Sequence, residues 1–101
     1  MFSEKPRQPV VQVNPSDVNA RSTLVTWPYN PGADEMPVTA YSLEYRNSTS
    51  TEYISLGAVL RKQIINLKPY TAYSVRLIAT SVLGVSLWSN FQNFTTKTAS
   101  K

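Results

Sequence analysis

Seven prolines interrupt this chain, and no helical periodicity survives between them. They stand at positions 6, 9, 15, 28, 31, 37 and 69, and a proline inside a helix removes a hydrogen bond and clashes with the preceding turn. Between the turn residues, apolar and polar side chains alternate, which is typical of β-strands that bury one face. We therefore expect an all-β protein.

The alternating runs predict seven strands, the number in an immunoglobulin-like sandwich. The strongest run is 73–81, in which every second side chain is apolar. In the run 38–46, Tyr41 points inward, whereas Glu44 and Arg46 belong to a charged outer face. The other five strands are expected at about 10–13, 23–27, 52–56, 62–67 and 91–96, with a turn at 14–17.

The length bounds the organisation, because 101 residues correspond to one domain. We place that domain at 9–97, between a flexible polar segment at 1–8 and a flexible tail at 98–101. No internal repeat divides it. Its core is expected to contain Trp27, Tyr41, Leu67, Tyr73, Val75 and Leu77.

The residue types argue against catalysis and against a cofactor. The chain has no cysteine and no histidine, which removes thiolate nucleophiles, the usual zinc ligands and the usual base near neutral pH. The adjacent acids Asp34 and Glu35 sit in a Pro/Gly loop, where we expect them to be solvated. A net charge of +4 with no Lys/Arg run longer than two does not predict nucleic-acid binding. The apolar runs are too short to insert into a membrane.

Several motifs in register carry a resemblance to a known family. The segment Leu67–Tyr73 reads L-x-P-x-T-x-Y, and Val25–Trp27 reads V-x-W. Tyr41–Tyr45 has the Y-x-v-x-Y form, and Thr95–Thr96 is the closing pair. Two further pieces are Pro31 with Gly32, and the series Ala79, Ser81, Gly84, Ser86 and Ser89.

Together these motifs resemble the fibronectin type III domain over about residues 9–96. The resemblance implies a seven-stranded antiparallel Greek-key β-sandwich. It also implies a tyrosine corner, in which Tyr73 is buried and its hydroxyl bonds to the chain just upstream. The family's Arg-Gly-Asp tripeptide is absent.

The loop after the 73–81 strand is unusually apolar. It contains Val82, Leu83, Val85, Leu87 and Trp88. Exposed together, these side chains would form a contact patch for a protein partner. The alternative is that Leu87 and Trp88 fold over the end of the sandwich, or pack on a neighbouring domain.

The same segment faintly resembles the W-S-x-W-S box of cytokine receptors, in which arginines stack between aromatic rings. Arg76 is on the right strand to stack on Trp88. The second aromatic residue is Phe91, however, and the ladder of several arginines is missing. We therefore do not expect such a box.

Two sequons for N-glycosylation begin at Asn47 and Asn93, and they favour a secreted location. Asn47 falls in a predicted hairpin turn, and Asn93 should face outward on the last strand. Arg46 and Arg76 also point outward on neighbouring strands. They either form a basic face for heparan sulfate, or lie on a solvated face where Glu44 partly neutralises Arg46.

These features predict a non-catalytic interaction or spacer module of an extracellular receptor or adhesion protein. It would be monomeric alone and would contact a protein partner and neighbouring domains of its own chain. Two alternatives stay open. One is a domain of a cytoplasmic muscle or cytoskeletal giant protein, and the other is an ancillary domain of a secreted carbohydrate-active enzyme.

Overall fold

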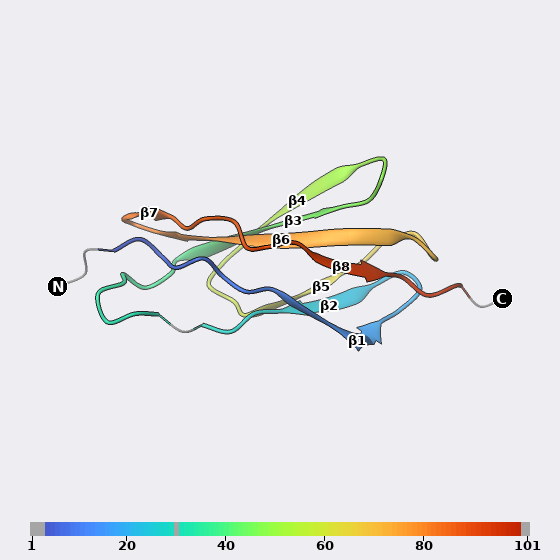
Figure 1. The fold of residues 1–101 in the computed structure, drawn as a ribbon, viewed down its shortest axis with the longest axis horizontal. Helices are drawn as coiled ribbons and strands as arrows, with labels where there is room; N and C mark the ends of the chain where they lie inside the picture. Colours follow the sequence, from blue (N-terminus) through green and yellow to red (C-terminus); the bar gives the residue numbers. More distant parts are fainter. Residues whose placement is uncertain (1–3, 30, 100–101) are drawn as a thin grey trace.

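The computed structural model describes residues 4–29 and 31–99, and within them the chain forms an all-β sandwich (Figure 1). One sheet has the strand order β1-β2-β5, and the other has the order β4-β3-β6, with β7 and β8 both paired to β6. Every strand pair described is antiparallel. The strands are β1 (Gln12–Val18), β2 (Thr23–Thr26), β3 (Ala40–Arg46), β4 (Thr51–Leu56), β5 (Arg61–Ile64), β6 (Ala72–Ser81), β7 (Gly84–Val85) and β8 (Gln92–Thr95).

The eighth strand is the short β7, which forms in the segment that was expected to be a loop after the 73–81 strand. The short strand β7 pairs with one end of β6, and β8 pairs with the other end. The chain between them leaves the regular ladder but stays beside β6. The predicted sandwich is therefore correct, and the number of strands differs by the additional β7.

The first strand differs more from the sequence prediction. The expected turn at 14–17 lies inside β1, where the register with β2 is irregular between Val13 and Val18. Because β1 is the edge of its sheet, Pro15 removes no ladder hydrogen bond that a neighbour needs. An edge strand thus tolerates a sequence that reads as a turn.

The core lies between the two sheets and contains all six side chains expected there, each between 0 and 5% exposed. The Trp27 and Tyr41 rings lie 5.4 Å apart, and the indole N–H of Trp27 donates to the carbonyl of Val59 at 3.0 Å. Burial raises the pKa of the Tyr41 hydroxyl above its usual value. Each fully buried aliphatic side chain here contributes about 1.5–3 kcal/mol.

The turn before β6 has the contact that the family resemblance implied. The Tyr73 hydroxyl oxygen accepts a hydrogen bond of 2.8 Å from the backbone N–H of Lys68. The Tyr73 ring also stacks on Phe94 of β8, with centroids 5.6 Å apart. This residue therefore joins the turn, the centre of the sheet and the last strand.

The molecule is elongated, with extents of 56 × 25 × 19 Å. Its first and last described residues lie at opposite ends (Figure 1). The β6–β7 turn lies at the end where the chain enters, and the β3–β4 turn lies toward the other end. Residues 1–3 of the expected flexible segment and 100–101 of the expected tail lie outside the described residues.

Candidate interaction surface

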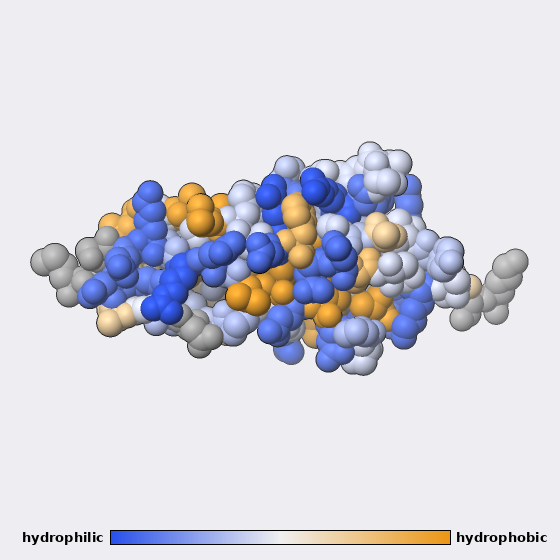
Figure 2. Space-filling model, in the orientation of Figure 1, coloured by the Kyte–Doolittle hydropathy of each residue, from blue (hydrophilic) through white to orange (hydrophobic). Residues whose placement is uncertain are grey.

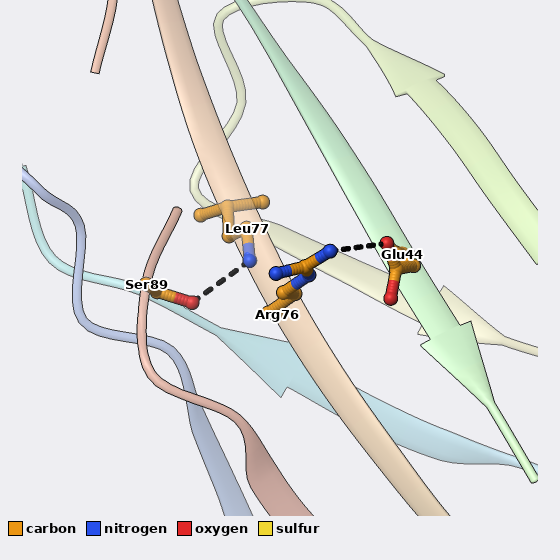
Figure 3. Close-up of polar contacts among 4 residues, drawn as sticks. All are labelled: Glu44, Arg76, Leu77 and Ser89. Carbon is orange, nitrogen blue, oxygen red and sulfur yellow. Dashed lines mark hydrogen bonds and ion pairs between the residues drawn. The ribbon is translucent and has the colours of Figure 1, made fainter. Parts of the chain in front are cut away.

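The outer face of the larger sheet carries an ion pair (Figure 3). Glu44 on β3 and Arg76 on β6 are register partners, and Arg76 Nη2 donates to Glu44 Oε1 at 2.9 Å. The Glu44 side chain is only 2% exposed, and that of Arg76 is 28% exposed. The alternation correctly pointed Glu44 outward, but the prediction that it lies on a solvated face and neutralises Arg46 was wrong. Its partner is Arg76, because the ladder sets these two residues opposite each other.

Aromatic rings from the segment between β7 and β8 enclose this ion pair. The Arg76 guanidinium carbon lies 4.4 Å from the Trp88 ring centroid and 4.7 Å from that of Phe91. Arg46 covers Phe91 at 4.2 Å. Sequence reasoning did not predict such a stack because this chain lacks the ladder of several arginines. Two arginines are nevertheless enough to alternate with the two rings. Stacking on a ring face attracts a cation by about 0.5–2 kcal/mol, depending on desolvation.

Two buried serines hold this segment against β6. Ser89 Oγ accepts the backbone N–H of Leu77 at 2.8 Å (Figure 3), and Ser86 Oγ accepts that of Ala79 at 2.9 Å. In return, the N–H groups of Ser86 and Ser89 donate to the carbonyls of Ala79 and Leu77 at 2.8 Å. Serine hydroxyls therefore replace the backbone carbonyls of a regular strand. Sequence reasoning identified these serines only as part of a family pattern, without this role.

Exposed apolar side chains gather on and beside β7. Val82 is 70% exposed, Val85 52% and Leu87 76%. Leu83 is also exposed, and Figure 2 shows an apolar area over β7 at the end where the chain enters. Gly84 has a φ of +135°, a conformation that favours glycine and turns the chain back onto β6. Trp88 is half-buried in the aromatic stack, so the structure separates it from the four other residues of the predicted patch.

The two sequon asparagines line one open hollow of about 420 Å³. Asn47 lies in the β3–β4 turn, and Asn93 lies on β8 opposite Ser74. Arg46 and Ser74, which are register partners on β3 and β6, also line this hollow. The sequence places these asparagines 46 positions apart, and only the sheet order brings them together.

A second buried carboxylate lies in the loop between β2 and β3. Arg7 Nε lies 3.0 Å from Glu35 Oε1, and the Glu35 side chain is 4% exposed. The backbone N–H of Glu4 donates to the carbonyl of Asp34 at 3.1 Å, and Pro6 is buried. Asp34 is exposed as expected, but the prediction that Glu35 is solvated was wrong, because residues 4–8 lie over it.

Neither a metal site nor a membrane helix is found in the part of the chain that the structure describes. No three His, Cys, Asp or Glu side chains there lie close enough together to hold a metal ion. No helix of residues 4–29 or 31–99 is long and apolar enough to cross a membrane.

The two packed antiparallel sheets and the tyrosine corner define an immunoglobulin-like β-sandwich, and comparison with known proteins identifies its family. Residues 5–95 match the family "Fibronectin type III domain". Mouse "Protein sidekick-2" is 35% identical over 92 residues, which are 85% of this chain and 4% of that protein. The chain therefore belongs to the fibronectin type III family.

Solved structures agree with this assignment. The sixth fibronectin type III domain from human fibronectin type III domain containing protein 3 has a TM-score of 0.79 at 28% identity, covering 100% of this chain and 94% of that one. A structure of titin kinase and its flanking domains has a TM-score of 0.73 at 29% identity. That comparison covers 94% of this chain and 18% of the other. Domains of this type thus occur within much longer chains.

Proposed function

We propose that this domain is a non-catalytic protein-interaction module in a multidomain receptor or adhesion protein at the cell surface. The observation that carries the proposal is the group of exposed apolar side chains Val82, Leu83, Val85 and Leu87 at one end of the rod. Apolar patches on otherwise polar surfaces mark contact sites. The similarity to a small part of a much longer sidekick protein supports a setting among other domains.

The outer-face arginines give less support to heparan sulfate as a ligand. Arg76 is held by Glu44, and its guanidinium faces two rings, so its charge is largely engaged within the domain. Arg46 is the more exposed of the two and also stacks on Phe91. We therefore propose a protein partner or a neighbouring domain for the apolar end, and a monomer for the isolated domain.

Photo-crosslinking tests the apolar end directly. A photoreactive amino acid replaces Leu87 in the parent protein on its native cells, and the matched control replaces Ser55, which is exposed on β4. We expect cross-links from position 87, to another protein or to a neighbouring domain, that position 55 does not form. Equal yields from the two positions would overturn the proposal for this surface.

Surface labelling tests the extracellular location. A membrane-impermeant amine reagent on intact cells should modify Lys68 and Lys97, which are both exposed. Labelling only after cells are lysed would favour the cytoplasmic giant-protein alternative, for which the similarity to the titin structure is an argument. Specific retention of the parent protein on polysaccharide would favour the ancillary domain of a carbohydrate-active enzyme.

A further inference from the structure

We propose that Asn47 is the glycan acceptor of this domain, and that pairing of β8 with β6 closes Asn93 to the same reaction. The inference rests on the proposed extracellular location, but it concerns which asparagine reacts once the chain is in a secretory compartment. Both residues begin an Asn-x-Thr sequon, the pattern that N-glycosylation requires. The two asparagines differ in backbone conformation, because Asn47 lies in a turn and Asn93 lies in a paired strand.

Asn47 is presented in a side-chain-stabilised turn. Its Oδ1 accepts the backbone N–H of Thr49 at 2.8 Å, the Thr49 hydroxyl at 3.0 Å and the Ser50 N–H at 2.9 Å. The Ser50 hydroxyl also donates to this oxygen, at 3.3 Å. All four donors approach the oxygen of the amide, which leaves the reacting nitrogen, Nδ2, outside these bonds. The hydroxyl that the sequon requires thus already lies beside the acceptor amide. Ser48, Thr49 and Ser50 are exposed and Asn47 itself is half-buried, so the turn is accessible around the acceptor.

Asn93 is held in a strand instead. Its backbone is in register with Ser74 on β6, and its Oδ1 accepts the Ser74 hydroxyl at 2.7 Å. The next residue, Phe94, is buried and stacks on Tyr73. In extended backbone, side chains two residues apart are separated by about 6.5 Å, so Thr95 stands away from the Asn93 amide. Drawing residues 93–95 into an enzyme's site would break both the pairing and this stack.

The order of synthesis adds to the difference. When Asn47 has been made, its strand β3 still lacks its neighbour β6, which ends at Ser81. At about 5–20 residues per second, the intervening residues take roughly 2–7 s to make. By contrast, β6 is complete before Asn93 is synthesised, and hairpin-type pairing takes only microseconds once both strands are present. Asn47 therefore stays in a turn both before and after folding, whereas Asn93, although exposed, is free of strand pairing only briefly.

The reaction is the transfer of an oligosaccharide from a lipid-linked pyrophosphate donor. The anomeric carbon of the first sugar forms a C–N bond with Asn47 Nδ2, and its bond to the pyrophosphate oxygen breaks. The amide loses one proton to a base of the transferring enzyme, and the lipid pyrophosphate leaves with the electron pair. Since Asn47 and Asn93 line the same hollow, a glycan on Asn47 would also cover the approach to Asn93.

The test is secretion of this chain from animal cells behind a cleavable leader. The intact mass is measured with and without a glycosidase that releases N-linked glycans. Wild type and Asn93→Gln should carry one glycan at Asn47. Asn47→Gln and Thr49→Ala should carry about tenfold less glycan than wild type, because Asn93 reacts only in molecules in which β8 has separated from β6. Two glycans on the wild type, a retained glycan at Asn93 in Asn47→Gln, or none at Asn47 would overturn the proposal.

A further variant tests the role of the strand. In the Asn47→Gln background, Phe94→Ala removes the stack on Tyr73 but preserves the sequon at Asn93. We expect Asn93 to gain a glycan in this protein, whether β8 loosens locally or the domain unfolds more widely. Continued absence of the glycan would overturn strand pairing as the reason. Because the leader sets the compartment, none of these results depends on the location of the native protein, which surface labelling tests separately.

Discussion

The domain contains two nearly identical ion pairs in very different surroundings. Glu44–Arg76 and Glu35–Arg7 have oxygen–nitrogen distances of 2.9 and 3.0 Å, and their carboxylate side chains are 2% and 4% exposed. The cations differ, because the Arg76 side chain is 28% exposed and that of Arg7 is 66% exposed. Distance alone would rank the two pairs as equal. Their effect on stability depends on whether the cation can reach water.

The structural reason is the element that supplies each arginine. Arg76 lies in the longest strand, beside its partner in the ladder and between two aromatic rings. Its Nε has no hydrogen-bond partner, so the rings and Glu44 compensate its lost hydration. Arg7 belongs to a segment outside the sheets that contacts the β2–β3 loop. Removing Arg76 should therefore leave a trapped charge, and removing Arg7 should let water reach Glu35.

The largest effect is expected for Arg76→Ala. An unpaired buried carboxylate costs about 3–5 kcal/mol, and partial exposure of Arg76 moves the estimate to the lower end, about 3 kcal/mol. Urea unfolding followed by tryptophan fluorescence measures it. Arg46→Ala is the matched control on the same sheet, since it removes one exposed stacking contact and should cost under about 1 kcal/mol. Glu44→Gln added to Arg76→Ala should restore part of the loss.

A loss below about 1 kcal/mol for Arg76→Ala would contradict the comparison. It would mean that the face over Glu44 opens easily and that the aromatic stack does not exclude water. The two ion pairs would then differ in the exposure of their arginines but not in their effect on stability.

The second prediction tests what keeps the stack closed. Ser89→Ala leaves the buried N–H of Leu77 without its hydroxyl acceptor, although the backbone N–H of residue 89 still donates to the Leu77 carbonyl. An unsatisfied buried donor costs about 1–3 kcal/mol, so we expect about 2 kcal/mol. Amide hydrogen exchange at Leu77 should accelerate by about thirtyfold at that value. Ser55→Ala on the exposed side of β4 should change neither the free energy of unfolding nor the exchange rate of the Leu77 amide. An unchanged exchange rate in Ser89→Ala would contradict the prediction, because it would show that another group accepts the hydrogen bond from the Leu77 N–H.

Most of the fold could be predicted because it depends on local, repeated signals. The alternation in 73–81 indicates a strand with one buried face, and the L-x-P-x-T-x-Y segment indicates the Tyr73 corner. Trp27 is buried as its strand alternation requires. The burial of these residues follows from the pattern of their nearest neighbours in the sequence, so one sequence is enough to predict it.

The two buried glutamates could not be predicted in this way. The period of β3 gives the direction of Glu44 but not what lies above it, and the cover comes from residues about 45 positions later. Glu35 sits in a loop that reads as solvated, and it is buried by residues 4–8, which themselves read as flexible. The shared hollow of Asn47 and Asn93 has the same origin. In each case the decisive contact joins distant segments that carry no periodic signal.

The smallest expected effect is that of Arg7→Ala, about 1 kcal/mol or less. The exposed guanidinium is already hydrated, and residues 4–8 can lift from the loop so that Glu35 gains water instead of remaining an isolated charge. High salt should weaken the wild-type Arg7 contact and reduce the difference between wild type and variant, whereas it should leave the effect of Arg76→Ala nearly unchanged. Urea unfolding at low and high salt measures both, with Arg61→Ala on β5 as the exposed control. A loss for Arg7→Ala as large as that for Arg76→Ala would mean that residues 4–8 are an integral part of the folded domain. Its boundary would then begin before residue 9, as the family match from residue 5 allows.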